Sequence, residues 1–552
     1  MDKTEKTLTI PGSLAAKGVN VTPFVVKKLE ELAENGGGTL LFEKGEYHFY
    51  PQGTYNGFFA PCNNTSGNKQ VCFPIIGGSD ITVDGSGSLF VFHGRVFPFI
   101  VSESRSVTLK NFTCETYLSP VAVLEIIEKN DDGFLCRIDK GASPYTTKDG
   151  HLFFDREEYV VGTDDRKLSL HSLDRMKIIY LLAGDAPSVR TDNLAAPAIF
   201  TDAFDVGDRL YLRYRDTDTG IHCPYETGER VVINLGERRE NALFFFENSQ
   251  NVLVENVTIR RFGGMGFIAQ LCSDIRICGV RTDKSTHSDI VTLTADAFHL
   301  VNCSGVFELA CCNMESFLDD ACNVHGVYTV VDSICGDTVH MRLGHEQQDF
   351  FSPFSESDRV RFIDPSNLEV LAEAIVKDVY ICGTDGLTLN ASMDFLYGKD
   401  RVKEGFFVET PEKMPDILIH DNIFRDFPHI RLSGMGKITV NDNTISDCSK
   451  ALVLYDLAAY WYESGRIKDA DIYENSFVNC NELGGDSFID ISVSGFDRES
   501  APKIHENISI HDNSFSKLRN FAVTAAGVKK IQVYGNTFDG NKQDEKRIRI
   551  KN

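Results

Sequence analysis

The sequence predicts an all-β fold: a right-handed parallel β-helix (a solenoid) with two inserted small β-barrels and a short N-terminal capping helix. Three observations support this prediction. Short apolar strands recur along most of the chain, Asn residues follow the later strands at repeated offsets, and two long stretches of strand pairs interrupt the repeat. The 552 residues exceed a typical single globular core. A solenoid reaches this length because each coil contacts only its neighbours.

The composition is that of an ordinary folded chain, and it narrows the range of partners. Hydrophobic residues make up 42% and charged residues 25%, and the formal net charge is −24. This charge argues against nucleic acid and anionic membrane surfaces as partners. No apolar run reaches the roughly 18 residues that a membrane span needs, so no span is expected. The first residues, MDKTEKTLTIPGS, contain no apolar signal region, so we expect a cytoplasmic protein or an exported one whose leader has been removed.

The 15 cysteines lie mostly inside apolar, strand-like runs, where free thiols act as small hydrophobic residues. Cys62 and Cys72 are the one pair considered for a disulfide. No Cys-x-x-Cys pair occurs, so we expect no structural zinc. We expect no other metal either, because no His-rich ligand set accompanies the candidate catalytic carboxyl groups, and no cofactor is expected.

Residues 20–37 predict one helix, the first element of the chain. Thr22 is the expected N-cap, Pro23 suits the first turn, and apolar residues recur at helical spacing up to the glycines at 36–38. A strand follows at 39–42. We expect the helix to cover the open end of the stack, where unpaired strand edges are otherwise exposed.

The later coils carry one Asn each at an equivalent position. The spacings are 21, 32, 38 and 23 residues, so short coils of about 21–23 residues alternate with coils that carry loops. We interpret these residues as an internal ladder of stacked amides at a turn, in preference to a catalytic role. They are Asn422, Asn443, Asn475, Asn513 and Asn536.

The two interruptions divide the chain into five parts. Both contain strand pairs with turns but no coil pattern, and both are interpreted as all-β insertions. The loop 344–348 follows the central coils and is expected to overhang them. The parts are an N-terminal cap with the first coils (1–118), an inserted barrel (119–243), coils with the acidic residues (244–326), a second inserted barrel (327–408) and the C-terminal coils (409–552).

Three acidic residues of the central coils are the candidate catalytic groups. Asp319 and Asp320 follow Asp296 by 23 and 24 residues, which is one coil. Their carboxyl groups therefore stack side by side if the chain coils at that period, because neighbouring strands lie about 4.8 Å apart. Glycoside hydrolysis uses two carboxyl groups at such short range, one as acid and one as base. The alternative is that all three are solvated turn residues.

Six further residues are candidates for substrate binding. Gln270 ends a Gly-rich strand that either admits a ligand or simply bends, and Asn323 and His325 alternate after the Asp pair. A lone His is more often structural. The only tryptophan lies in an aromatic loop that either stacks on a sugar or seals the fold. The candidates are Gln270, His299, Asn323, His325, Trp461 and Glu463; no metal ligands are proposed.

Four motifs occur in order: GMGFIAQ (264–270), TADAFHLVNCSG (294–305), FLDDACNVHG (317–326) and YWYESG (460–465). On a β-helix with two insertions this set resembles glycoside hydrolase family 110, the inverting α-1,3-galactosidases. The resemblance covers essentially the whole chain. It implies an exo-acting enzyme that removes terminal α-1,3-linked galactose from blood-group-B-type or linear glycans.

The resemblance also implies roles. Asp296 matches the general acid, and Asp319 and Asp320 match the pair that holds and activates water, which leaves open which of the two is the base. Gln270, His325, Trp461 and Glu463 match positions that line the galactose pocket. An inverting reaction needs acid and base about 6.5–9.5 Å apart.

The chain departs from the family at 426–429, where it has Asp-Phe-Pro-His in place of an Arg-Ala-Arg-Gly segment, with Arg431 shifted. This departure implies a changed aglycone or galactoside.

Two rival functions remain at this stage. A polygalacturonase-like hydrolase that acts on another terminal sugar or a uronide needs several Lys or Arg residues around the pocket. A non-catalytic glycan-binding solenoid predicts that Asp319 is dispensable. The expected partner is an oligosaccharide or glycoconjugate with terminal α-galactose, and a homodimer is also considered.

Overall fold

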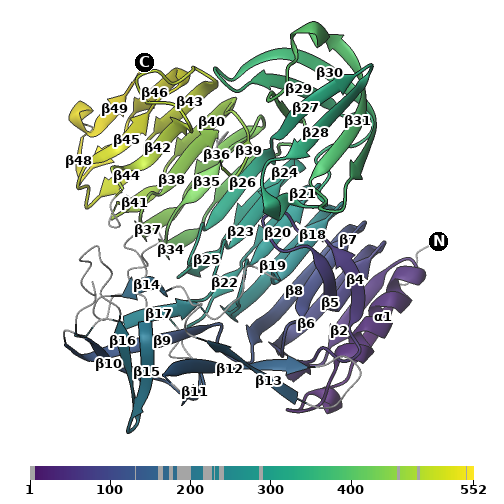
Figure 1. Cartoon of the computed structure of the whole chain (residues 1–552), viewed down its shortest axis with the longest axis vertical. Helices are drawn as coiled ribbons and strands as arrows, with labels where there is room; N and C mark the ends of the chain where they lie inside the picture. Colours follow the sequence, from purple (N-terminus) through teal and green to yellow (C-terminus); the bar gives the residue numbers. More distant parts are fainter. Residues whose placement is uncertain are drawn as a thin grey trace.

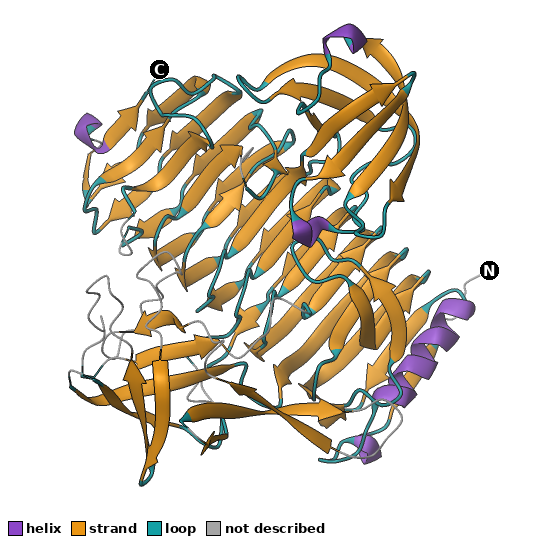
Figure 2. Ribbon diagram, viewed as in Figure 1, coloured by secondary structure: helices purple, strands orange, loops and turns teal. Residues whose placement is uncertain are grey.

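The computed structural model describes residues 6–130, 132–148, 150–159, 166–172, 178–182, 200–214, 227–228, 230–234, 241–284, 290–456, 460–481, 485–542 and 544–551. It is a long parallel β-helix with antiparallel insertions on either side (Figures 1 and 2). Strands from successive coils run side by side from the N-terminal helix to the C-terminal coils. The predicted parallel β-helix is therefore confirmed.

Two large sheets form the walls of the solenoid, and most of their pairings are parallel. The strands of the 13-stranded sheet follow one another in chain order, with β39 (Glu463–Ser464) pairing off the main path. These strands are β4 (Tyr55–Phe59), β5 (Gly67–Ile76), β7 (Phe97–Ser102), β18 (Phe244–Glu247), β20 (Phe267–Gln270), β23 (Phe298–Val301), β26 (Cys322–Val327), β35 (Ile430–Leu432), β38 (Leu452–Asp456), β42 (Ser487–Val493), β45 (Phe521–Ala525) and β49 (Ile548–Ile550).

The 21-stranded sheet forms the rest of the wall. In its later coils two short strands follow one another across a sharp turn. Its strands are β1 (Thr7–Ile10), β2 (Gly38–Phe42), β3 (Glu46–Phe49), β6 (Ser79–Phe92), β8 (Arg105–Thr116), β19 (Gln250–Arg261), β21 (Ser273–Cys278), β22 (Arg281–Thr282), β24 (Ser304–Ala310), β25 (Asn313–Glu315), β33 (Asp416–His420), β34 (Ile423–Phe427), β36 (Lys437–Asn441), β37 (Thr444–Cys448), β40 (Asp469–Tyr473), β41 (Ser476–Val478), β43 (His505–His511), β44 (Ser514–Ser516), β46 (Val528–Tyr534), β47 (Thr537–Phe538) and β48 (Asn541–Lys542).

The second insertion is a closed six-stranded barrel, as predicted. Its strands are β27 (Thr329–Cys335), β28 (Thr338–Leu343), β29 (Arg359–Asp364), β30 (Glu369–Cys382), β31 (Thr388–Tyr397) and β32 (Phe407–Glu409). The described part of the first insertion forms a six-stranded and a three-stranded antiparallel sheet, and part of the predicted barrel lies outside the described residues. Its strands are β9 (Val121–Lys129), β10 (Gly133–Ile138), β11 (Tyr145–Lys148), β12 (His151–Tyr159), β13 (Arg166–Ser172), β14 (Ile178–Leu182), β15 (Phe200–Val206), β16 (Arg209–Tyr214) and β17 (Arg230–Asn234).

The capping helix α1 (Thr22–Glu34) lies across the N-terminal end of the stack (Figure 1). It is shorter than predicted, and Thr22 is its first helical residue and not its N-cap, which is Val21. The Thr22 hydroxyl donates instead to the carbonyl of Tyr50 at 3.0 Å, so a tertiary contact takes the group that the sequence assigned to capping. The backbone N–H of Thr22 is bonded by the side chain of Asn20 at 3.0 Å.

The predicted amide ladder is confirmed. Each side-chain amide donates to the Oδ1 of the next Asn at 2.9–3.0 Å, from Asn422 through Asn443, Asn475 and Asn513 to Asn536. The same Oδ1 atoms also accept the backbone N–H of the preceding Asn. All five side chains are buried. The ladder closes the corner between the paired short strands of each coil.

The interior of the solenoid is apolar and partly aromatic. Phe99, Phe244, Phe267 and Phe298 occupy one register position and stack with ring centroids 4.7, 4.4 and 5.0 Å apart. Cys62 and Cys72 are both free and buried, so the disulfide considered above does not form. The stacked phenylalanines hold strands β7, β18, β20 and β23 in register from inside the solenoid.

Candidate active site

The site lies on the outer face of the 13-stranded sheet, over strands β20, β23, β26 and β35. His299, Asn323 and Arg431 share one register position on neighbouring strands, because β23 pairs with β26 and β26 with β35 in parallel. Phe298 and Cys322 alternate with them and point into the core. The alternation of a β-strand thus places apolar residues inward and polar residues outward at every coil.

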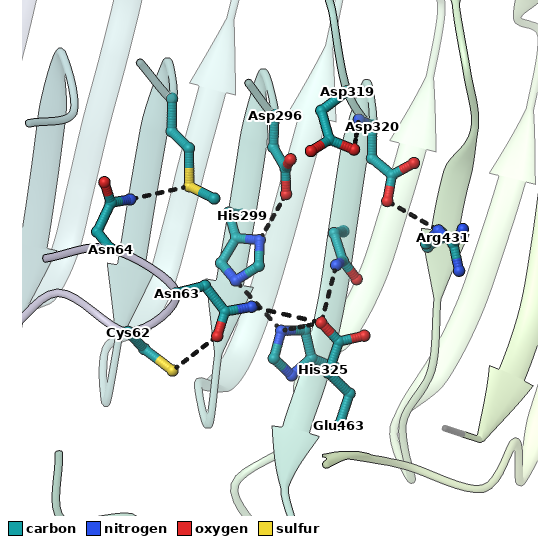
Figure 3. A network of polar contacts seen from close by, with 12 residues as sticks. Cys62, Asn63, Asn64, Asp296, His299, Asp319, Asp320, His325, Arg431 and Glu463 are labelled. Atoms are coloured by element: carbon teal, nitrogen blue, oxygen red, sulfur yellow. Dashed lines mark hydrogen bonds and ion pairs between the residues drawn. The ribbon is translucent and has the colours of Figure 1, made fainter. Parts of the chain in front are cut away.

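Asp296, Asp319 and Asp320 lie in the turns that precede β23 and β26. Figure 3 shows their carboxyl groups side by side on neighbouring coils. Asp296 and Asp320 are 3% and 5% exposed, whereas Asp319 is half-buried, and its Oδ1 accepts the backbone N–H of Asp320 at 3.1 Å. The one-coil offset predicted from the sequence therefore brings the three carboxyl groups together.

Asp296 is held by a buried histidine. Its Oδ2 lies 2.7 Å from Nδ1 of His299, whose Nε2 lies 3.2 Å from Nε2 of His325. Nδ1 of His325 bonds the carbonyl oxygen of Gly326 at 2.7 Å. Both rings are buried, and burial lowers the pKa of His325 to about 4, so this ring is neutral at neutral pH.

Asp320 is held from the other side. Nε of Arg431 lies 2.8 Å from its Oδ2, and Nδ1 of His429 lies 3.2 Å from its Oδ1. Burial raises the pKa of Asp320 to about 7; the charge of Arg431 opposes this shift, and the charge of Asp319 adds to it. Burial, with the charges of Arg431 and Lys450, lowers the pKa of His429 well below its usual value. Two partners thus fix Asp320.

Glu463 closes the lower edge of the site (Figure 3). Its Oε1 accepts the side-chain amides of Asn323 at 3.3 Å and Asn63 at 3.4 Å, and it lies 3.4 Å from Nε2 of His325. Its Oε2 accepts the hydroxyl of Tyr455 in a short hydrogen bond. Glu463 therefore gathers four side chains, from β26, β38 and the segment 60–66, around one carboxylate.

The segment 60–66, which joins β4 to β5, contributes residues that the sequence did not indicate. Besides Asn63, it supplies Asn64, whose amide donates to Sδ of Met265 at 3.2 Å. Oδ1 of Asn64 is buried and has no hydrogen-bond partner within the described part of the chain. Gln270 anchors this segment, because it accepts the N–H of Cys62 at 2.8 Å and donates to the carbonyl of Ala60 at 3.1 Å. Substrate contact by Gln270 therefore stays a prediction.

The loop 344–348 overhangs the site, as predicted. The carbonyl of Gln347 accepts the N–H of Asn63 at 2.7 Å, and the His345 ring lies 4.3 Å from the Trp461 ring. Gln348 donates to the carbonyl of Trp461 at 3.0 Å. A side chain at Gly344 would collide with the ring of Tyr462, so this glycine permits the close approach of the two loops.

These contacts join three distant segments, 60–66, 344–350 and 460–465, into one wall beside the carboxyl groups. The site therefore contains three carboxyl groups, two buried imidazoles, an arginine bound to one of the carboxylates, and several side-chain amides. Within the described residues, no group of three or more His, Cys, Asp or Glu side chains is arranged to hold a metal ion. No helix among them is long and apolar enough to cross a membrane.

The structure places all nine residues that the sequence singled out at this site. Seven belong to the network of polar side chains around the carboxyl groups, while Gln270 and Trp461 contact the loops that form the wall. Sequence reasoning missed Asn63, Asn64 and Tyr455, and it found Arg431 without its partner Asp320. The only sequence signal for the first two is the Asn-Asn pair at 63–64, in a hairpin that carries no coil pattern.

Known proteins similar to this chain share most of its length. The alpha-1,3-galactosidase A of Shewanella woodyi is 28% identical over 97% of this chain and 86% of its own. The alpha-1,3-galactosidase B of Bacteroides thetaiotaomicron is 24% identical over 94% and 83%. The alpha-1,3-galactosidase A of Streptomyces avermitilis is 26% identical over 90% and 81%. No protein-family model matches the chain.

Solved structures similar to this chain are more distant. A polygalacturonase from Erwinia carotovora aligns over 100% of this chain and 98% of its own, with 11% identity and a TM-score of 0.41. An exopolygalacturonase from Thermotoga maritima aligns over 97% and 93%, with 12% identity and a TM-score of 0.35.

Proposed function

We propose that this chain is a parallel β-helix glycosidase. In particular, we propose an exo-acting α-1,3-galactosidase of glycoside hydrolase family 110, which removes terminal α-1,3-linked galactose with inversion of configuration. The observation that carries the proposal is the stack of Asp296, Asp319 and Asp320 on neighbouring coils. The curated relatives named alpha-1,3-galactosidase over most of the chain support the substrate.

In the proposed mechanism, Asp296 is the general acid. It donates its proton to the glycosidic oxygen, which leaves with the electron pair of the C–O bond. Its Oδ2 lies 2.7 Å from Nδ1 of His299, so the carboxyl group is oriented before the substrate arrives. This orientation lowers the cost of reaching the transition state.

Asp319 is the proposed general base. It takes one proton of a water molecule whose oxygen attacks the anomeric carbon on the face opposite the leaving group. Asp319 suits this role better than Asp320 because it is more exposed to the solvent that supplies the water molecule, whereas Asp320 is buried. We assign Asp320 to orienting that water molecule and to holding the turn.

The wall of three segments supports exo action, because it confines one side of the pocket to a terminal sugar. Asn323, His325 and Glu463 present polar groups on the same face of the sheet as the carboxyl groups. Trp461 offers an aromatic face to the apolar side of galactose. The expected substrates are blood-group-B-type or linear glycans, and a homodimer is a further part of the proposal that light scattering tests.

The decisive experiment is proton NMR of the anomeric signals during hydrolysis of an α-1,3-galactosyl disaccharide. We expect β-galactose to appear first, and Asp296→Asn to release none. The control is Asp469→Asn, an exposed aspartate of β40 remote from the site. Initial α-galactose would mean retention and exclude this two-carboxyl mechanism. If the wild type releases no sugar, the galactosidase assignment fails, and the next screen covers other terminal sugars and uronides.

A further inference from the structure

A chain of hydrogen bonds runs inward from Asp296 and ends on the protein backbone. Oδ2 of Asp296 bonds Nδ1 of His299, Nε2 of His299 bonds Nε2 of His325, and Nδ1 of His325 bonds the carbonyl oxygen of Gly326, at 2.7, 3.2 and 2.7 Å. The three side chains are at most 3% exposed, so water does not intervene (Figure 3). The terminal carbonyl fixes the positions of the protons along this chain.

A carbonyl oxygen only accepts hydrogen bonds, so Nδ1 of His325 carries a hydrogen. Because burial lowers the pKa of His325 to about 4, the ring is neutral and its Nε2 presents a lone pair. That lone pair faces Nε2 of His299 at 3.2 Å, so Nε2 of His299 must carry a hydrogen to make the bond. The tautomer of each ring thus follows from the carbonyl of Gly326.

Only one hydrogen bond remains to be specified, between Nδ1 of His299 and Oδ2 of Asp296. A neutral His299 has no hydrogen left on Nδ1, so it accepts a bond from a protonated Asp296. A cationic His299 instead donates to an ionised Asp296. Both arrangements contain the same single proton, which moves between two atoms 2.7 Å apart.

We infer that the His325–His299 pair stores the proton that Asp296 delivers, so that the two histidines are positioning residues for the general acid. This inference rests on the proposed function. Loss of the proton leaves either a lone pair of His299 against the carboxylate or two imidazole lone pairs against each other. Such contacts are costly in a buried site, so the hydrogen bonds among these three side chains are all made only while the proton is present.

A charge beside these hydrogen-bonded side chains also favours the state that holds the proton. Oε1 of Glu463 lies 3.4 Å from Nε2 of His325, and this carboxylate accepts three further hydrogen bonds, so its negative charge favours a proton on the pair. The positive charge of Arg431 acts on Glu463 as well, but Arg431 is bound to Asp320 at 2.8 Å. The titratable and charged groups that face these three side chains are Asp320, Cys322 and Glu463. Arg431 and Tyr455 in turn lie against Glu463.

The proton balance of one turnover is as follows. For delivery, the carboxyl group of Asp296 turns its protonated oxygen from His299 toward the leaving glycosidic oxygen. That oxygen takes the stored proton and the electron pair of the broken bond, which leaves Asp296 and the two imidazoles one proton short. The attacking water molecule gives one proton to Asp319 and its hydroxyl to the anomeric carbon. Return of a proton from Asp319 to Asp296, through solvent after product release, restores both groups.

His325→Gln tests this inference. A glutamine amide can donate to Nε2 of His299, which frees Nδ1 of His299 to donate to an ionised Asp296 with no stored proton. We expect the basic limb of kcat/KM for an α-1,3-galactosyl disaccharide to move down by about one pH unit. Hydrolysis of 4-nitrophenyl α-galactoside, whose leaving group needs no proton, should change little at the optimum. An active variant with an unchanged basic limb overturns the inference.

The matched control is His505→Gln. His505 is also buried, burial lowers its pKa to about 4, and it bonds the backbone of Ile467 and Ser492 away from the site. This variant should lower stability without moving the pH profile. An equal shift in both variants would also overturn the inference, since it would reflect general loosening.

A second measurement needs neither folding of the variant nor catalysis. Nitrogen-15 NMR of histidine-labelled wild-type protein reports which ring nitrogen carries hydrogen. We expect His325 neutral with hydrogen on Nδ1, and His299 with hydrogen on Nε2. Hydrogen on Nε2 of a neutral His325 overturns the inference. If the protein cleaves no galactoside, the proposed function fails, while this spectrum still decides the arrangement of protons.

Discussion

The amide ladder of the C-terminal coils and the polar network of the central coils are built in the same way and do different things. In both, polar side chains from successive coils stack at strand spacing and are buried. The ladder repeats one residue type, and its amides bond one another from Asn422 to Asn536. The network places a different side chain in each coil, and it leaves Asp319 half-exposed and Oδ1 of Asn64 without a partner in the described chain.

This difference teaches how a solenoid separates stability from chemistry. Repetition of one self-complementary side chain satisfies its donors and acceptors and stabilises the stack. Variation of the side chain from coil to coil brings unlike groups, here carboxyl, imidazole and amide, next to one another. The following predictions treat the two regions as separable, in order of decreasing effect.

The largest effect is expected at Asp296. The change Asp296→Asn should lower kcat on an α-1,3-galactosyl disaccharide by about 10²–10⁴-fold, because proton donation to the leaving group is lost. The midpoint of thermal unfolding should stay within a few degrees of that of the wild type. Steady-state kinetics and calorimetry measure the two quantities. A large loss of stability would show that the two regions are not separable.

The ladder should respond in the opposite way. Asn443→Ala removes the acceptor of the Asn422 backbone N–H and the donor to the carbonyls of Ile419 and Asn441. Several buried groups are left unpaired, so the free energy of unfolding should fall by about 3 kcal/mol. Activity per folded molecule should be unchanged. Chemical denaturation measures the loss, and Asn441→Ala, which removes a bond to Asp442 in a part-exposed turn, is the control.

A third expectation concerns the loss of stability at acidic pH. Burial lowers the pKa of His505 to about 4, below its value in the unfolded chain, so the unfolded state binds more protons between these values. Stability therefore falls as the pH drops from 7 through 5, and at pH 5 His505 alone should account for about 2 kcal/mol. His505→Gln should flatten this slope in unfolding measurements at several pH values. An unchanged slope would mean that this ring is protonated in the folded protein.

The smallest effect is expected at Trp461. Its ring lies beside His345 at the wall of the site. Trp461→Leu should raise KM by about five- to tenfold with a smaller change in kcat, because aromatic contact contributes about 1 kcal/mol to binding. The control is Tyr534→Ala, which removes an aromatic ring stacked on His511 at 4.8 Å on the other sheet. A similar rise in KM for both variants would argue against a sugar contact at Trp461.

Features that follow the coil period could be predicted from the sequence. The offset of one coil placed Asp296 beside Asp319 and Asp320, and repeated spacing predicted the amide ladder. Both depend on local strand pairing, which the period encodes directly. The strand pairs of the second insertion were also within reach, because β27 with β28, β29 with β30 and β30 with β31 pair as neighbours along the chain. The closure itself joins the first strand, β27, to the last, β32.

Features that depend on contacts between loops could not be predicted. Asn63 and Asn64 lie in a hairpin without a repeat, and nothing local indicates that they meet Glu463. Arg431 was visible, but its pairing with Asp320 follows from the path of the chain at 426–429. The N-cap prediction at Thr22 was wrong for the same reason, since a distant carbonyl takes its hydroxyl.

The wall of the site has a consequence for how the protein folds during its synthesis. The amide of Asn63 and the carboxylate of Glu463 meet across 400 residues of sequence. When the ribosome has synthesised the central coils, all three aspartates are present. The segment 460–465, which completes the wall, has not yet been made. Closing so distant a contact comes late in folding, after the intervening coils and the second barrel have formed. Appearance of activity during synthesis therefore marks the moment when the coil that carries Glu463 docks.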